Sequence, residues 1–291
     1  MVYVRRLIDD NIWQLTTTAD TLPAASPPTS AIRSTKQDLH PRLSPDGKRL
    51  AYTSTRSGFW EIWVSDLDGG NAVQLTDLKA PTGTGVPYWS PDGEVIAFAS
   101  DAPGQFDVFV VPASGGRVRN LTSNPAFDHV PAFSSDGRWL YFSSSRGGSF
   151  QIWRIPAAGG DPVQITNEGG FASQESANGA DVYFTATAAV GGTTPIWRMP
   201  ASGGQAVKVI DGAVNGAFAV VTRGLYFLDM AGGGVRLQFY DFATRRAAIV
   251  ARDLGPGAEI GGFHASADGR TIFFVRRESA LDDLVLVENF R

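Results

Sequence analysis

A four-residue turn motif recurs along this chain at a nearly constant interval. It reads Ser-Pro-Asp-Gly at 44–47 and 90–93, Ser-Ser-Asp-Gly at 134–137, Ser-Ala-Asn-Gly at 176–179 and Ser-Ala-Asp-Gly at 266–269. The glycines of the first four copies are 46, 44 and 42 residues apart, and Gly224 divides the remaining 90 residues into two equal spans. Self-similarity at such a period indicates one supersecondary unit that is stacked several times. The repeat therefore constrains the fold more tightly than any other feature.

Each repeat predicts four antiparallel strands. The turn tetrapeptide suits a type I turn closed by a glycine, and the runs beside it are rich in β-branched and aromatic residues that alternate with polar ones. Around Gly47 the expected strands are 42–44, 50–53, 61–64 and 73–76. A four-stranded sheet of this length, repeated around an axis, is the blade of a β-propeller, and neighbouring blades bury each other's apolar faces. We therefore predict an all-β propeller formed by residues 1–291 as a single domain.

The number of blades depends on how the two ends of the chain are counted. Full blades are expected at 37–78, 84–124, 128–168, 170–211 and 215–252, and incomplete ones at 1–36 and 260–291. Counted separately, these units predict seven blades, with six as the alternative. The Pro-rich stretch 22–29 is either a long loop leading to an outer strand at 31–34 or a disordered linker. The start within a blade also suggests a fragment of a longer protein.

Composition excludes several classes of function. The net charge is −4, from 25 basic and 29 acidic residues with no basic stripe, which argues against nucleic-acid binding. No apolar run approaches the roughly 20 residues of a membrane span, and the first residues lack the apolar core of a signal peptide, so cytoplasmic and extracytoplasmic locations both stay open. The absence of cysteine excludes disulfides, thiol catalysis and a thiolate zinc site.

The repeat resembles a known family. Ser-Pro-Asp-Gly, Glu-Ile-Trp at 61–63, Gly-Gly at 69–70 and Gln-Leu-Thr at 74–76 are similar to the TolB-type, WD-like propeller repeat. The likeness is strong over 38–168, looser over 169–255 and recognisable again over 256–287. Residues 286–291 resemble the end of propeller regions attached to bacterial winged-helix regulators and serine/threonine kinases. The resemblance implies a binding module of a bacterial sensory or scaffolding system, because such propellers serve as docking platforms, as gating domains of peptidases and only rarely as enzymes.

Acidic residues at the crossovers between repeats form a candidate metal site. Asp38 and Asp128 occupy the same position of two repeats, just before the innermost strand, and Asn215 occupies it in another. Together with Glu175 they are candidate ligands for Ca²⁺, which prefers six to eight oxygen atoms. The alternative is that the aspartates cap the crossover backbone through local hydrogen bonds. Both interpretations stay open.

Glu175 is an anomaly within its strand. The equivalent residues in the other repeats are all apolar: Leu43, Trp89, Phe133, Val220 and Ala265. A carboxylate at such a position needs a partner, or its pKa rises. Either Glu175 belongs to a functional site, or a local bulge turns it toward water in the channel.

The opposite face of the innermost strands is expected to line the channel. It carries Arg42, Tyr88, Gln174 and His264, a mixture that suits a ligand-binding channel. If the protein were a hydrolase, His129 or His264 would be the candidate base, although a structural role for His264 is an alternative. Arg56 and Arg146 are expected in hairpins at the rim of a blade. The tryptophans at 13, 63, 153 and 197 are expected in the core between blades rather than on a stacking platform.

Two functional hypotheses follow. The first is a binding module that recognises a protein, peptide or small ligand at the channel or rim, and it needs no catalytic residues. The second is a calcium-dependent propeller hydrolase of the lactonase or esterase type, with the ion at the channel mouth polarising a carbonyl or activating water. The common nucleophile, zinc-helix, phosphate-loop and dinucleotide motifs are absent from the sequence.

Overall fold

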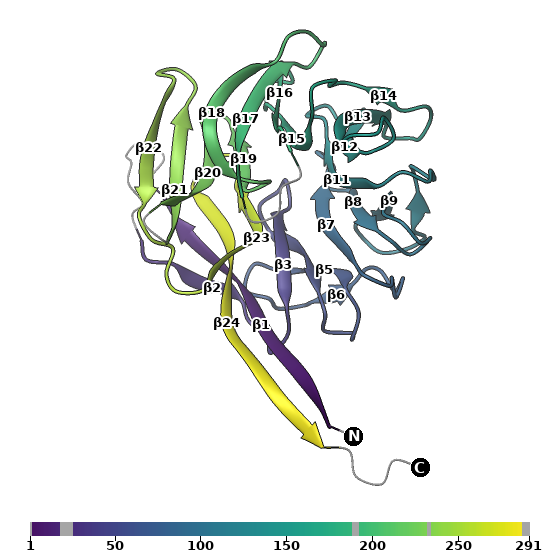
Figure 1. Cartoon of the computed structure of the whole chain (residues 1–291), viewed down its shortest axis with the longest axis vertical. Helices are drawn as coiled ribbons and strands as arrows, with labels where there is room; N and C mark the ends of the chain where they lie inside the picture. The colour runs from purple at the N-terminus through teal and green to yellow at the C-terminus, as the bar shows by residue number, and fades with distance from the viewer. Residues whose placement is uncertain (1, 18–25, 188–191, 232–233, 287–291) are drawn as a thin grey trace.

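The computed structural model describes residues 2–17, 26–187, 192–231 and 234–286. These residues form six four-stranded antiparallel sheets arranged around a central axis (Figure 1). The described residues contain no helix, and therefore none long and apolar enough to cross a membrane. We number the sheets as blades 1 to 6.

The strands have the following bounds. Blade 1 contains β23 (Ala258–Ala265), β24 (Thr271–Leu286), β1 (Val2–Thr16) and β2 (Thr29–Ile32). Blade 2 contains β3 (Asp38–Leu43), β4 (Arg49–Ser54), β5 (Glu61–Asp66) and β6 (Val73–Gln74). Blade 3 contains β7 (Thr84–Trp89), β8 (Val95–Ser100), β9 (Asp107–Pro112) and β10 (Arg119–Asn120). Blade 4 contains β11 (Asp128–Phe133), β12 (Trp139–Ser144), β13 (Gln151–Pro156) and β14 (Val163–Gln164). Blade 5 contains β15 (Phe171–Glu175), β16 (Asp181–Thr185), β17 (Thr193–Pro200) and β18 (Val207–Val214). Blade 6 contains β19 (Phe218–Val221), β20 (Gly224–Ala231), β21 (Gly234–Asp241) and β22 (Arg246–Ala251).

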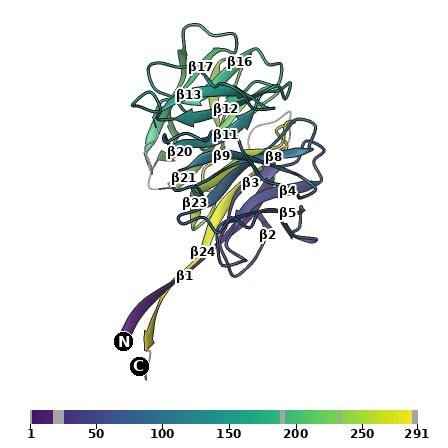
Figure 2. The same ribbon diagram turned by 90° about the vertical axis from the view of Figure 1, so that its right-hand side faces the viewer.

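Blade 1 is shared between the two ends of the chain. Strand β1 pairs antiparallel with β24 from Val2↔Leu286 to Thr16↔Thr271, and β2 adds to the outer edge of β1. Figure 2 shows β1 and β24 running together away from the wheel toward both termini. The prediction of seven blades is therefore wrong, because the two incomplete units complete one another. Their union closes the ring without leaving an exposed strand edge at the junction.

The recurring turn is held by its own side chains. In blade 2 the Ser44 hydroxyl donates a 2.6 Å hydrogen bond to the Asp46 carboxylate and accepts one of 2.9 Å from the Arg49 backbone N–H. Gly47 closes the turn with a φ of 72°, a conformation that side chains disfavour. The same serine bonds recur at the turns that begin at Ser90, Ser134, Ser176 and Ser266. Local chemistry thus places an equivalent turn at the end of five innermost strands.

The core lies between blades rather than within them. One cluster joins Val108 of blade 3 to Leu140 and Phe142 of blade 4, all fully buried. Trp153 packs against this cluster, and Trp197 packs against the corresponding cluster between blades 4 and 5. Each blade therefore depends on its neighbours for burial of its apolar face.

A bulge interrupts most innermost strands at the same place. In β3 the register shifts between Leu39 and Arg42, and comparable shifts occur in β7, β11 and β15. His40 lies in the bulge of β3 with a φ of 53°, and Val86 lies in that of β7 with a φ of 56°. Bulges bend a strand and re-aim its side chains. Each of these bulged strands is thereby divided into a crossover end and a turn end.

Candidate functional site

The channel has two chemically different mouths. All innermost strands run from a crossover to a turn, so the crossovers gather at one mouth and the turns at the other. We call these the crossover mouth, which includes Asp38 and Asp128, and the turn mouth, which includes Arg42 and His264. The predicted site residues divide between these two mouths.

The turn mouth contains a pocket of about 590 Å³ to which all six blades contribute. Its lining includes Arg42, Tyr88, Gln174 and His264, so the structure brings together the four residues predicted to line the channel. Glu175 also borders this pocket. The convergence arises because the same strand position is repeated around the axis.

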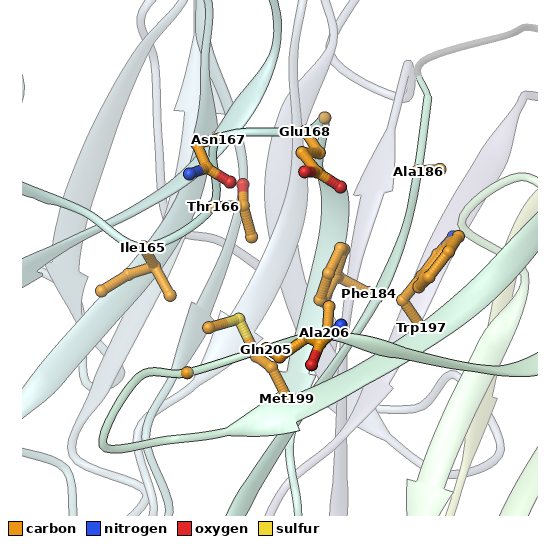
Figure 3. Close-up of a pocket in the computed structure, with 12 residues that line it drawn as sticks. Ile165, Thr166, Asn167, Glu168, Phe184, Ala186, Trp197, Met199, Gln205 and Ala206 are labelled. Atoms are coloured by element: carbon orange, nitrogen blue, oxygen red, sulfur yellow. The ribbon is translucent and has the colours of Figure 1, made fainter.

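A second pocket, of about 500 Å³, lies between blades 4 and 5 (Figure 3). Its walls include Phe184, Trp197 and Met199 from blade 5 and the segment 165–169 from blade 4. The sequence provides no motif for this pocket.

Arg42 is the charged group at the base of the turn mouth. Its Nη1 donates a 2.7 Å hydrogen bond to the Phe263 carbonyl of blade 1, and its guanidinium lies 5.7 Å from the centre of the Tyr88 ring. Its Nε is buried without a hydrogen-bond partner, and no ion pair joins Arg42 to a carboxylate among the described residues. Burial lowers the pKa of Arg42, yet arginine stays protonated in proteins. In the described part of the chain, the turn mouth therefore holds a cation that forms no ion pair.

His264 and Tyr88 add neutral polar groups beside Arg42. Burial, followed by the nearby Arg42 charge, lowers the pKa of His264 well below its ordinary value, so the imidazole is neutral near pH 7. Burial raises the pKa of Tyr88, with Arg42 opposing the shift, so the phenol keeps its proton. Both side chains can donate a hydrogen bond to an anionic ligand group.

Gln174, which also borders the turn mouth, links two blades through its side-chain amide. Its amide nitrogen donates to the Phe218 carbonyl at 2.8 Å, and its amide oxygen accepts from the Val220 N–H at 3.0 Å. The side-chain amide thus forms one donor and one acceptor hydrogen bond with the backbone of β19. Gln174 fastens blade 5 to blade 6, which leaves less of its amide for a ligand.

The Glu175 carboxylate is hydrogen-bonded to two groups of the neighbouring blade. Its carboxylate accepts hydrogen bonds from the Ser135 backbone N–H at 2.6 Å and from the Tyr141 hydroxyl at 3.0 Å. The carboxylate in an otherwise apolar strand position is therefore explained by a link between blades 4 and 5. Neither partner was identified from the sequence.

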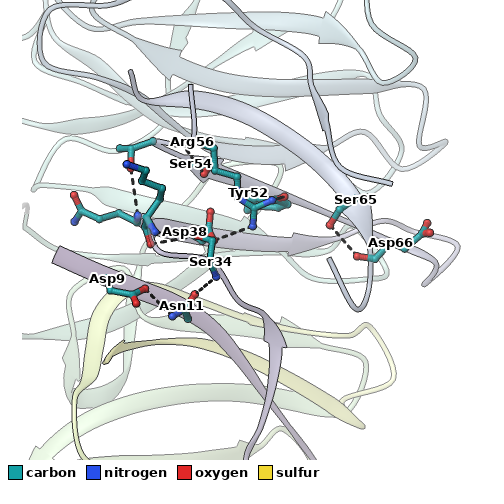
Figure 4. A network of polar contacts seen from close by, with 12 residues as sticks. Asp9, Asn11, Ser34, Asp38, Tyr52, Ser54, Arg56, Ser65 and Asp66 are labelled. Atoms are coloured by element: carbon teal, nitrogen blue, oxygen red, sulfur yellow. Dashed lines mark hydrogen bonds and ion pairs between the residues drawn. The ribbon is translucent and has the colours of Figure 1, made fainter. Parts of the chain in front are cut away.

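Asp38 and Asp128 lie in buried ion pairs at the crossover mouth. The Asp38 carboxylate accepts from Arg56 at 3.0 Å and from the Ser34 hydroxyl at 2.7 Å (Figure 4). Asp128 accepts from Arg146 at 2.6 Å. Burial raises the pKa of Asp128, while Ser144 and Arg146 oppose the rise. The partner of each aspartate is thus a guanidinium rather than the crossover backbone.

The spacing of acid and base in the sequence indicates these two ion pairs. Arg56 follows Asp38 by 18 residues, and Arg146 follows Asp128 by the same interval. Two repeats therefore carry the same acid and base at the same separation. Since strand register is repeated, this coincidence predicts a contact within each blade.

The predicted calcium ligands do not converge. Glu175 lies at the turn end of its strand and Asp38 at the crossover end, positions about 15 Å apart along an extended strand. Asn215 accepts a 2.9 Å hydrogen bond from the Thr185 hydroxyl. Over the described ranges, no group of three or more His, Cys, Asp or Glu side chains is arranged to hold a metal ion. The predicted ion site has no counterpart in this part of the chain.

His129 lies at the crossover mouth, away from His264. Its ring is 4.9 Å from that of Phe106 and 5.4 Å from that of Phe127, measured between ring centres. Burial in this aromatic cluster lowers the pKa of His129 to about 4. The two histidines proposed as alternative bases therefore do not share a site.

Comparisons with known proteins agree with this architecture. A family model described as the TolB beta propeller domain matches residues 25–189. A structure described as a TolB from Agrobacterium tumefaciens is similar with a TM-score of 0.73 at 20% identity, covering 94% of this chain and 99% of that one. A puromycin-hydrolyzing peptidase of Mycobacterium tuberculosis is similar with a TM-score of 0.59 at 14% identity, covering 80% and 41% of the two chains. At these identities the two structures show the fold alone.

A curated relative matches over a short segment. Tricorn protease homolog 1 of Streptomyces coelicolor is 54% identical over 37 residues, which are 13% of this chain and 4% of that protein. The chain therefore corresponds to only a small part of the length of this relative.

Proposed function

Because the chain belongs to the TolB beta propeller domain family, we propose that it is a binding module whose turn mouth receives the anionic end of a peptide. The module would serve a bacterial sensory or scaffolding system. The observation that carries this proposal is the Arg42 guanidinium, which is buried in the channel without a carboxylate partner among the described residues.

Two other partly buried arginines of the propeller have the carboxylate partner that Arg42 does not have among the described residues. Arg56 is neutralised by Asp38, and Arg146 is neutralised by Asp128. A buried charge without a partner is costly, and a ligand carboxylate would offset that cost through charge-assisted hydrogen bonds. The free Nε of Arg42 offers a donor for such a bond.

The shape and charge of the turn mouth support a peptide end rather than a bare anion. Its volume of about 590 Å³ falls in the usual range of ligand pockets. Asp46 and Asp268 border the pocket from two turns, whereas Arg42 lies on the strand below them. A ligand would therefore place its carboxylate at Arg42 and polar or basic groups at the acidic turns. The names of two similar proteins, a protease homolog and a peptidase, also favour a peptide.

The proposal is tested with two probes that differ only in charge. N-acetyl-dialanine carries a free carboxylate, and its C-terminal amide does not. Calorimetric titration should show about tenfold or tighter binding of the acid, the effect expected for hydrogen bonds to a charged group. Arg42→Gln should abolish the preference for the acid. Arg117→Gln, an exposed arginine outside the turn mouth, is the matched control and should retain the preference. Equal binding of acid and amide by the unmodified protein would contradict the proposal.

A further inference from the structure

The pocket between blades 4 and 5 borders an aromatic pair, the buried Phe184 and the partly buried Trp197, whose counterparts in blades 2 and 4 contact a guanidinium. In blade 5, Phe184 on β16 pairs with Trp197 on β17. Both side chains border the pocket of about 500 Å³, with Met199 beside them and Glu168 across from them (Figure 3).

In blades 2 and 4, an arginine side chain lies against the equivalent aromatic pair. Arg56 lies 5.3 Å from the Tyr52 ring centre and 6.0 Å from that of Trp63, the equivalent pair of blade 2. In blade 4, Arg146 lies 5.2 Å from the Phe142 ring centre and 5.0 Å from that of Trp153. Each arginine also meets a carboxylate of its own blade. The same aromatic geometry therefore holds an arginine twice within this molecule.

Blade 5 has lost both charged members of that arrangement. The aspartate position is taken by Gly170, and the arginine position, four residues after the strand aromatic, is Ala188 in the sequence. The hairpin sequence 186–192 contains no lysine or arginine at all. In blade 1, Arg276 lies 4.0 Å from the Trp13 ring centre. Among the described residues, Trp197 is thus the member of its tryptophan series without a guanidinium.

Loss of the pair does not by itself open a pocket. Blade 3 also lacks it, with Thr84 and Ala102 at the two positions. There Phe98 and Phe109 stack with ring centres 5.6 Å apart, and both are buried. Blade 5 instead keeps the tryptophan and leaves it bordering open space.

The charge of the pocket suits a cation. Glu168 is the ionisable residue among the described lining residues. Its side chain is exposed, and it has no ion pair within the described structure. Figure 3 shows its carboxylate directed toward Phe184 from the neighbouring blade. Glu168 therefore supplies, from the neighbouring blade, the negative charge that aspartate supplies in blades 2 and 4.

We propose that this pocket binds an arginine side chain of a partner polypeptide, against Phe184 and Trp197 and opposite Glu168. Arginine is favoured over lysine because its planar guanidinium stacks on aromatic faces and forms paired bonds to a carboxylate. The site is separate from the turn mouth, so each assignment can fail without the other.

The test follows the indole signal of Trp197 by NMR. The seven tryptophans give separate ¹⁵N indole signals, and Trp197→Phe assigns the one of interest. The probe is N-acetyl-arginine amide, and the comparison probe is N-acetyl-citrulline amide, its neutral counterpart of nearly the same shape. Saturable movement of the Trp197 signal with the arginine probe, and none with citrulline, is the expected result.

Two charge variants complete the design. Glu168→Gln should weaken the arginine probe by about three- to fivefold, the effect of one partly exposed charge pair. Glu94→Gln removes an exposed glutamate of blade 3 and should leave the affinity unchanged. The proposal is overturned if the Trp197 signal stays still, if citrulline binds equally well, or if both variants behave alike. Tighter binding of tetramethylammonium than of the arginine probe would overturn the choice of arginine.

Discussion

The hydroxyl of Tyr141, on β12 of blade 4, donates a 3.0 Å hydrogen bond to the carboxylate of Glu175, at the end of β15 in blade 5. Glu175 borders the turn mouth, and the bond joins two blades whose strands are not hydrogen-bonded into one sheet. The Glu175 carboxylate, at a strand position that is apolar in the other blades, therefore links blades 4 and 5 through hydrogen bonds.

The pKa of Tyr141 should report this contact. Burial raises it to about 12, and the Glu175 charge contributes to the rise. Glu175→Gln keeps an acceptor but removes the charge, so the pKa of Tyr141 should fall toward its ordinary value. Because the folded-state pKa is raised above 10, stability present below pH 10 is lost as the pH rises toward 12, and this loss should shrink in the variant. Difference absorbance titration of tyrosinate measures the shift; an unchanged titration curve would refute the assignment.

Breaking the Asp38–Arg56 pair should destabilise the propeller. Asp38→Ala leaves Arg56 partly buried without its counter-ion, and we expect a loss of about 2 to 4 kcal/mol in the free energy of unfolding. The double variant with Arg56→Met also removes the unpaired guanidinium and should recover part of the lost free energy of unfolding. Urea denaturation of the two variants, with Asp161→Ala as an exposed control, provides the comparison. A stable Asp38→Ala protein would argue that the pair is not structural.

Acid should weaken the fold through His129. Its folded-state pKa is about 4, below the ordinary 6.5. The unfolded chain therefore takes up a proton first, and stability falls as the pH drops from about 6.5 toward 4. Between pH 7 and pH 5 this group accounts for about 2 kcal/mol. His129→Phe, which suits the surrounding aromatic rings, should flatten the pH profile of the unfolding free energy by that amount. A profile parallel to that of the unmodified protein would contradict the burial of this imidazole.

Removing residues 1–17 should open the ring. The deletion takes away β1, which pairs with β24 along nearly its whole length. The exposed edge of β24 would then be free to pair with another chain. We expect a lower melting temperature and self-association in light scattering. A monomer of unchanged stability would show that this closure is dispensable.

The parts of the structure that were predictable from sequence are those set by local chemistry. The turn that contains Ser44 and Asp46 is closed by bonds within six residues, so its repetition identified the blades. The blade number was not predictable in the same way, because closure pairs Val2 with Leu286 across the whole chain. The sequence of a partial blade at one end of the chain does not show whether it pairs with the partial blade at the other end.

The candidate site was likewise predictable only in part. Arg42 and His264 could be placed in one channel because they hold the same position of a repeated strand. The calcium hypothesis required knowledge of side-chain partners, which alignment does not provide. Asp38 had a partner in Arg56, and only the spacing shared with Asp128 and Arg146 would have revealed it.

The most direct measurement is the ¹⁵N signal of the Arg42 Nε–H, assigned with Arg42→Gln and followed during titration with N-acetyl-dialanine. If the turn mouth receives the end of a peptide, this signal moves to a saturating limit with the acid and stays in place with the amide. If the signal ignores both probes, or follows them equally, Arg42 does not recognise a carboxylate and the account of this propeller as a peptide-binding module is wrong.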